Sequence, residues 1–76
     1  MRVKIVEIEA GTDNQRELFT SDSWSMPVPC VGHHMVVPFG IALVRVKVTS
    51  VEWNLRIGQV AIYVSVTNLN QIPSEG

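Results

Sequence analysis

The sequence predicts a small all-β protein, and two observations favour this class. Valine alternates with other residues at every second position in residues 44–48, and apolar residues recur with the same period in 60–66. A period of two is typical of strands that bury one face. Between these runs lie short segments rich in glycine, proline and asparagine, which are typical of turns. No segment favours a helix of more than one or two turns.

Length and composition describe one small domain, residues 1–76. A chain of 76 residues buries roughly 60% of the surface that its unfolded form exposes, which is near the lower limit for a fold held by its core alone. Only 17% of the residues are charged, against a usual fraction of about 25%. Two long stretches, 23–44 and 57–74, carry no formal charge. So much uncharged sequence predicts burial against another subunit or a partner.

The first predicted strand covers residues 2–9. Val3 and Ile5 share one parity, whereas Val6 and Ile8 share the other. Either a bulge between Ile5 and Val6 brings all four side chains to one side, or the strand is covered on both faces.

The next segment, 10–25, opens with turn-forming residues. Thr12 or Asp13 could cap a helix of one or two turns over residues 15–19. Large aromatic side chains bury well even among polar neighbours, and two of them are expected to anchor this segment on the sheet: Phe19 and Trp24.

Residues 26–40 are expected to be extended between tight turns, because they contain three prolines, which disfavour a central strand. A turn at 31–33 leads into a short strand, 34–37, which Pro38 is expected to end. The longest strand follows at 41–53. Its alternation changes parity after Thr49, which predicts a bulge or sharp bend near Ser50.

A hairpin turn at 54–58 leads into the last strand, 59–67, and residues 68–76 are expected to form a flexible tail. One face of the last strand is apolar, and the other is uncharged, which fits a central strand or an interface: Ala61, Tyr63, Ser65 and Thr67. Together the elements predict a four- to five-stranded meander that curls into a small SH3-like or OB-like barrel, with at most one short helix.

Charge and cysteine content narrow the class of function. The net charge is −1 and the pI is about 6.0, which gives no general attraction to nucleic acid or anionic membrane. Cys30 is the one cysteine, so an internal disulfide framework is excluded. The chain opens with charges at every second or third residue, unlike a signal peptide, and prolines and glycines interrupt its longest uncharged stretch. These features predict a cytoplasmic protein without a membrane span.

One cluster holds metal-capable or nucleophilic residues: Cys30, His33 and His34. Cys30 and His33 offer two ligands at a plausible spacing, and Asp22 could add a third, but a structural zinc site needs four. Adjacent histidines of an extended strand cannot both point inward. A Cys–His nucleophile pair needs a group that orients the imidazole and an oxyanion donor, and the sequence indicates neither. We therefore expect no metal site, no catalytic residue, no cofactor and no enzymatic activity.

Two further sets of residues suggest binding. Basic residues share a parity within each of two predicted strands and would form a stripe if those strands were neighbours: Arg2, Lys4, Arg45 and Lys47. Aromatic and imidazole side chains could line a ligand groove between subunits: Trp24, His33, His34 and Trp53. Outward charges on amphipathic strands and core tryptophans are the ordinary explanations of both sets.

Residues 26–66 also resemble a recurring type of small uncharacterised β protein found in phages and mobile gene cassettes. The resemblance rests on a Pro29-Cys-Val-Gly-His33 turn, on Val48-Thr-Ser-Val-Glu-Trp53 in the long strand, and on the apolar run 60–66. His33 stands where aspartate is common in that type. The resemblance implies a small barrel-like fold that often self-associates, and it supplies no catalytic residue.

From these observations we expect a non-catalytic β-barrel interaction module whose partner is itself, as a homo-oligomer, or an unidentified protein. The contact would use the uncharged face of the last strand or the 26–40 segment. Two alternatives stay open. One is a nucleic-acid-binding barrel that uses the basic stripe, and the other is a small-ligand-binding protein with its site between subunits.

Overall fold

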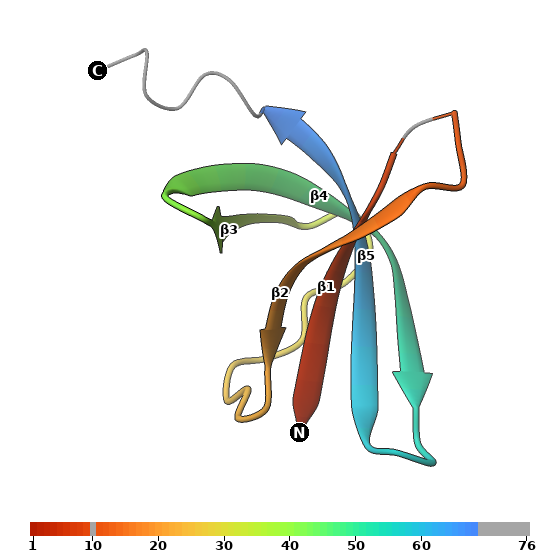
Figure 1. Ribbon diagram of the computed structural model, residues 1–76. Helices are drawn as coiled ribbons and strands as arrows, with labels where there is room; N and C mark the ends of the chain where they lie inside the picture. Colours follow the sequence, from red (N-terminus) through yellow and green to blue (C-terminus); the bar gives the residue numbers. More distant parts are fainter. Residues whose placement is uncertain (10, 69–76) are drawn as a thin grey trace.

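A computed structural model describes residues 1–9 and 11–68 as one strongly curled sheet of five strands (Figure 1). In chain order the strands are β1 (Arg2–Ile8), β2 (Gln15–Ser21), β3 (His34–Phe39), β4 (Ala42–Asn54) and β5 (Gln59–Asn68). The described residues contain no helix, so the predicted small, all-β, barrel-like fold is confirmed. None of them belongs to a helix long and apolar enough to cross a membrane.

The strand order, β2-β1-β5-β4-β3, differs from that of a simple meander. Consecutive strands form antiparallel hairpins at β1–β2, β3–β4 and β4–β5, but β1 pairs in parallel with β5. The uncharged strand β5 therefore occupies the centre of the sheet, as its sequence predicts. The consecutive strands β2 and β3 lie at the two opposite edges of the sheet.

The helix expected over residues 15–19 is wrong, because this segment is the first part of β2 and pairs with β1. A helix of five residues is too short to be stable by itself, whereas the strand gains a ladder of backbone hydrogen bonds along β1. The register opposes Ile5 to Phe19 and Val6 to Glu17, so Leu18 has no partner and forms a bulge. The bulge lets both Leu18 and Phe19 pack against the core.

The bulge at Leu18 lies opposite Ile5 and Val6, where the apolar pattern of the first strand changes parity. The extra residue, however, belongs to β2 and not to β1. Strand β1 pairs with β5 without interruption from Arg2 to Glu7, so its own alternation continues. Val3 and Ile5 point into the core, whereas Val6 is buried on the other face, beside Tyr63. The structure therefore corresponds to the second alternative for this strand, in which both faces are covered.

The bend predicted near Ser50 is confirmed. Val48 pairs with Val64 and Ser50 with Tyr63, so Thr49 is the extra residue of a bulge, and β4 turns sharply there (Figure 1). The Thr49 hydroxyl donates to the backbone carbonyl of Tyr63 at 3.1 Å. The bend allows one long strand to serve two parts of the curled sheet.

A second bulge lies nearer the other end of the β4–β5 ladder. Arg45 pairs with Asn68 and Val46 with Val66, which leaves Thr67 of β5 without a partner. The Thr67 hydroxyl donates to the carbonyl of Arg45 at 3.1 Å. Each bulge thus contains a threonine whose side chain bonds to the opposite strand.

The core lies inside the curl and consists almost entirely of β-branched residues. All five strands contribute to it, and no polar residue is buried among the described residues. Its members are Val3, Ile5, Leu18, Val37, Val44, Val46, Val48, Val60, Ile62 and Val64.

The other predicted boundaries shift by one or two residues: β1 ends one residue earlier than expected, and β4 begins and ends one residue later. Strand β3 starts at His34 as expected but continues through Pro38 to Phe39, because an edge strand tolerates proline. Strand β5 ends at Asn68, one residue beyond the prediction, and residues 69–76 of the predicted tail lie outside the described part of the chain.

Candidate functional site

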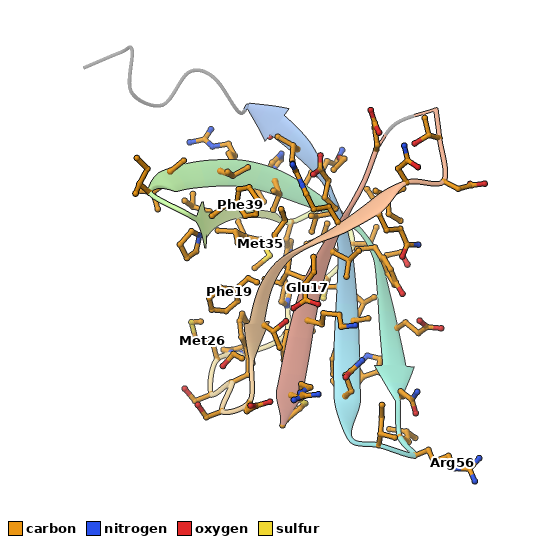
Figure 2. All side chains as sticks on the ribbon, in the orientation of Figure 1. Glu17, Phe19, Met26, Met35, Phe39 and Arg56 are labelled. Carbon is orange, nitrogen blue, oxygen red and sulfur yellow. The ribbon has the colours of Figure 1, made fainter. Side chains whose placement is uncertain are left out.

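A groove runs between the two edges of the sheet, where β2 and β3 face each other. It encloses about 240 Å³ and is bordered by β2, by the loop 23–26 and by four consecutive residues of β3, 35–38. Four apolar side chains follow one another along this side of the molecule (Figure 2): Phe39, Met35, Phe19 and Met26. Among the described residues, no charged side chain lines the groove. We call it the β2–β3 groove.

Trp24 forms one wall of the β2–β3 groove and carries its most informative polar atom. The backbone N–H of Trp24 donates to the carbonyl of Met1 at 3.3 Å, which ties the loop to the start of β1. The indole ring packs against the core. Its Nε1–H is buried, yet it has no acceptor among the described residues. A buried donor without an acceptor is destabilising, typically by about 1–3 kcal/mol, and native proteins contain few of them.

A second, wider hollow of about 460 Å³ adjoins this groove and shares Trp24, Met26, Met35 and Val36 with it. His33 and His34 line this hollow, so the structure brings together three of the four residues predicted to form a ligand groove. The fourth, Trp53, lies elsewhere. It lines an apolar hollow of about 290 Å³ near the β4–β5 turn, with Met1 and Leu55.

The Cys30–His33 turn uses its polar groups internally. The backbone N–H of His33 donates to the carbonyl of Cys30 at 3.0 Å, and the backbone N–H of Cys30 donates to Nδ1 of His33 at 3.2 Å. Gly32, whose φ is +95°, donates to the carbonyl of Val48 and fastens the turn to β4. In the described part of the chain, no three His, Cys, Asp or Glu side chains are grouped so that they could hold a metal ion.

The four basic residues do not form one stripe, because β5 separates β1 from β4. Arg2 donates to Asp22 at 2.7 Å, and this hydrogen bond raises the pKa of the guanidinium. Lys4 lies level with Ala61, which in turn faces Glu52 on β4. Lys47 pairs with Ser65, four residues further along β5.

The outer face of β5 is less open than its sequence suggests. Ala61 is only 8% exposed, and Tyr63 and Ser65 are half-buried. The Tyr63 hydroxyl donates to Glu52 at 3.3 Å. Burial, with a further contribution from Glu52, raises the pKa of Tyr63. Thr67 is exposed, but its hydroxyl is engaged at the bulge.

One group of exposed apolar side chains lies on the β3–β4 hairpin, and another lies near the β4–β5 turn. Of the ten large apolar side chains that are exposed in the described residues, four lie within residues 36–43: Val36, Phe39, Ile41 and Leu43. The pairs Val37–Val44 and Met35–Val46 point toward the core, so the alternating residues Val36 and Leu43 point away from it. We call the exposed side chains of Val36, Ile41 and Leu43 the hairpin patch.

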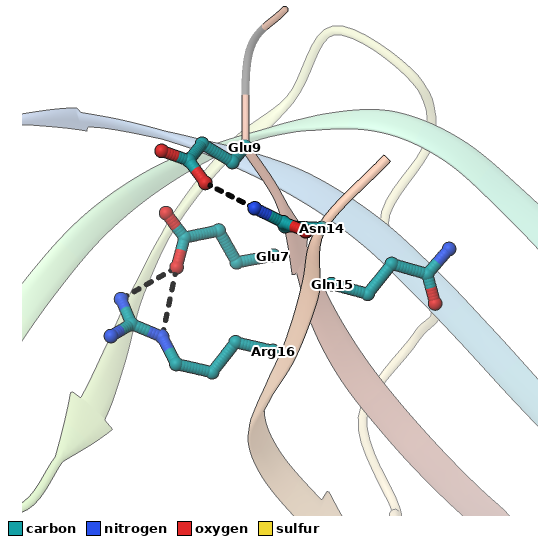
Figure 3. Close-up of a pocket in the computed structure, with 5 residues that line it drawn as sticks. All are labelled: Glu7, Glu9, Asn14, Gln15 and Arg16. Carbon is teal, nitrogen blue, oxygen red and sulfur yellow. Dashed lines mark hydrogen bonds and ion pairs between the residues drawn. The ribbon is translucent and has the colours of Figure 1, made fainter. Parts of the chain in front are cut away.

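A polar hollow lies at the β1–β2 turn (Figure 3). Arg16 donates to Oε1 of Glu7 through both Nε, at 3.1 Å, and Nη2, at 2.6 Å, and Nδ2 of Asn14 donates to Glu9 at 3.2 Å. The Arg16 guanidinium also lies 5.0 Å from the centre of the Phe39 ring on β3. These contacts hold the turn and join the β2 and β3 edges at one end of the groove.

Two features of the site have no clear sequence signal. Phe19 lies in a segment predicted to be helical, and Met26 and Met35 are isolated apolar residues between prolines and histidines. Their meeting in one groove depends on β2 and β3 being the two edges of a curled sheet. The charge-free stretch 23–44 was the one available signal, since it supplies most of the groove lining and the hairpin patch.

Comparison of the chain with protein-family models, with curated proteins and with solved structures gave no match. We therefore base the functional proposal on the geometry of the groove and of the hairpin.

Proposed function

We propose that this protein is a non-catalytic β-barrel interaction module that self-associates through the β3–β4 hairpin. The observation that carries the proposal is the hairpin patch. Val36, Ile41 and Leu43 are each more than half exposed, and they lie on a hairpin whose β3 strand is an edge of the sheet formed by the described residues. An exposed apolar patch on a sheet edge is a typical contact surface.

The position of the charged residues supports this choice of surface. Arg45 and Lys47 lie opposite Val36 and His34 at the base of the hairpin, where they would form the polar rim of a contact. The other predicted surface, the outer face of β5, exposes less apolar area because Ala61 and Tyr63 are covered within the monomer. Contact through the hairpin would also account for the charge-free stretch 23–44 by burying part of it.

The test is the mass in solution, measured by light scattering over a dilution series, for the wild-type protein and two variants. Leu43→Lys places a charge in the hairpin patch and should shift the assembly to monomer. Leu55→Lys is the matched control, because Leu55 is even more exposed but lies on the β4–β5 turn. We expect this variant to keep the wild-type mass.

Two results would overturn the proposal. If the wild-type protein is a monomer at the highest concentration, the hairpin patch does not mediate self-association. If Leu43→Lys assembles as well as Leu55→Lys does, the contact lies on another surface. Because both positions are exposed, neither lysine should destabilise the monomer by more than about 0.5 kcal/mol.

A further inference from the structure

We infer that the β2–β3 groove binds an extended, uncharged peptide of a partner protein, which pairs with the free edge of β3 and accepts a hydrogen bond from the indole of Trp24. This site overlaps the hairpin patch at Val36 but uses the backbone edge of β3 and the inner side chains of β2, whereas the hairpin patch consists of outward side chains. It does not depend on self-association.

The first argument is the direction of the β3 backbone groups. Gly40 and Ile41 form a two-residue turn between the paired residues Phe39 and Ala42, and the φ of Gly40 is +65°. The two residues that flank such a turn, here Phe39 and Ala42, form backbone hydrogen bonds with each other. Bonded and non-bonded pairs alternate along an antiparallel ladder, so Pro38 directs its carbonyl away from β4. Pro38 has no N–H to lose there, which is the usual position of proline in an edge strand.

The same alternation directs the N–H and C=O groups of Val36 and His34 away from β4. These groups therefore face the β2–β3 groove, which residues 35–38 line along one side. A row of free backbone donors and acceptors beside a groove is the arrangement that binds an added strand. The occupant that satisfies both kinds of group in alternation is another extended polypeptide.

The second argument is the buried Nε1–H of Trp24. Trp24 lines the groove, and its buried Nε1–H lacks an acceptor among the described residues. A backbone carbonyl on the far side of an added strand would supply that acceptor, since successive carbonyls of a strand point to opposite sides. Ser21 at the end of β2 and two serines of the loop, Ser23 and Ser25, add further polar groups along the groove.

The third argument concerns the side chains that the peptide would carry. The described residues that line the groove include no charged one, so a charged side chain directed into it would lose its hydration without gaining a partner there. Phe19, Met26 and Met35 offer aromatic and flexible thioether surface, which adapts to apolar side chains of different shapes. The groove therefore suits a strand with small or medium apolar residues at every second position.

The probe for the test is a hexapeptide of alternating valine and threonine, acetylated and amidated at its ends. Its binding is followed by the fluorescence of Trp24 in the Trp53→Phe variant, where Trp24 is the only tryptophan of the chain. The matched control peptide has the same side chains, but every backbone N–H is methylated. We expect the first peptide to shift the emission of Trp24 and bind, and the methylated peptide to bind at least tenfold more weakly.

Two protein variants test the individual contacts with a fluorescently labelled form of the same hexapeptide. Trp24→Phe keeps an aromatic ring but removes the indole donor, and it should weaken binding about five- to tenfold. Val36→Pro removes the free N–H at the centre of the β3 edge and should abolish binding. Because Val36→Pro could disturb the fold, its circular dichroism is compared with that of the wild type, and Trp24→Phe provides the independent check.

Each other outcome overturns the inference. Equal binding of the two peptides would mean that the groove accepts apolar molecules without strand pairing. Binding that dissociates a wild-type assembly in light scattering would mean that a second copy of the chain occupies the groove. A lack of binding at millimolar peptide would mean that the edge of β3 is not a peptide site.

Discussion

The two bulges of the β4–β5 ladder lead to a quantitative prediction about threonine hydroxyls. Thr49 and Thr67 are the unpaired residues of their bulges, and each donates from Oγ1 to a carbonyl of the opposite strand at 3.1 Å. Replacing either by valine keeps the shape and the β-branched side chain but removes the hydroxyl. We expect each substitution to lower the free energy of unfolding by about 1 kcal/mol, the typical net contribution of one such bond.

In a domain of this size, 1 kcal/mol corresponds to a fall of about 4–8 °C in Tm. The two threonines lie about four residues apart along the ladder, roughly 13 Å, so their effects should add to about 2 kcal/mol in the double variant. A chain of 76 residues is expected to have a total stability of about 4–11 kcal/mol, so the double variant should remain folded.

The assay is urea and thermal denaturation followed by circular dichroism, at one fixed protein concentration because self-association would change Tm. Thr20→Val is the matched control. Thr20 is an exposed strand residue whose hydroxyl donates to the Glu17 carboxylate and not to a backbone carbonyl, so its loss should change stability by less than about 0.5 kcal/mol. If Thr49→Val and Thr67→Val are no more destabilising than this control, the hydroxyls do not hold the bulges.

Three further predictions follow from the core, a titrating group and a turn. Ile62 is fully buried at the centre of β5, so Ile62→Ala should destabilise by about 2–5 kcal/mol in urea denaturation, whereas Ile41→Ala at the exposed hairpin tip should change little. Burial and Glu52 raise the pKa of Tyr63 above 10.0, so the stability that this group contributes is fully present below about pH 10 and is lost as the pH rises through the higher folded-state pKa. Urea denaturation at alkaline pH should therefore show a smaller loss in Tyr63→Phe than in the wild type, and an equal loss would contradict the assignment. Gly32→Ala should lower the free energy of unfolding by about 1–2 kcal/mol, because a Cβ at φ +95° is strained although nothing lies within 4 Å of it, and an unchanged Tm would show that the turn relaxes.

Strands with a clear period were predictable because the alternation is a local property. The long strand was expected at 41–53 and is observed at Ala42–Asn54, and the last strand was expected at 59–67 and is observed at Gln59–Asn68. The bulge at Thr49 was also predictable, because a change of parity within one apolar pattern requires an extra residue if both halves are to face the core.

The second strand and the groove were not predictable in the same way. Residues 15–21 have no strict alternation, and their structure depends on pairing with β1 and on the bulge at Leu18. The candidate ligand residues show the same division, since Trp24 and His33 lie near each other while Trp53 lies at a different hollow. Proximity between such residues follows from strand order, which a local pattern does not contain.

The sequence by itself determined the all-β class, the two long strands, the bend near Ser50 and the uncharged character of residues 23–44 and 57–74. These properties follow from side-chain period and composition, which act over a few neighbouring residues. The tertiary structure alone decided that β1 runs parallel to β5 and that β2 and β3 are the two edges. That arrangement requires contacts between distant segments to be more favourable than the local alternatives, and it creates the β2–β3 groove and exposes the hairpin patch.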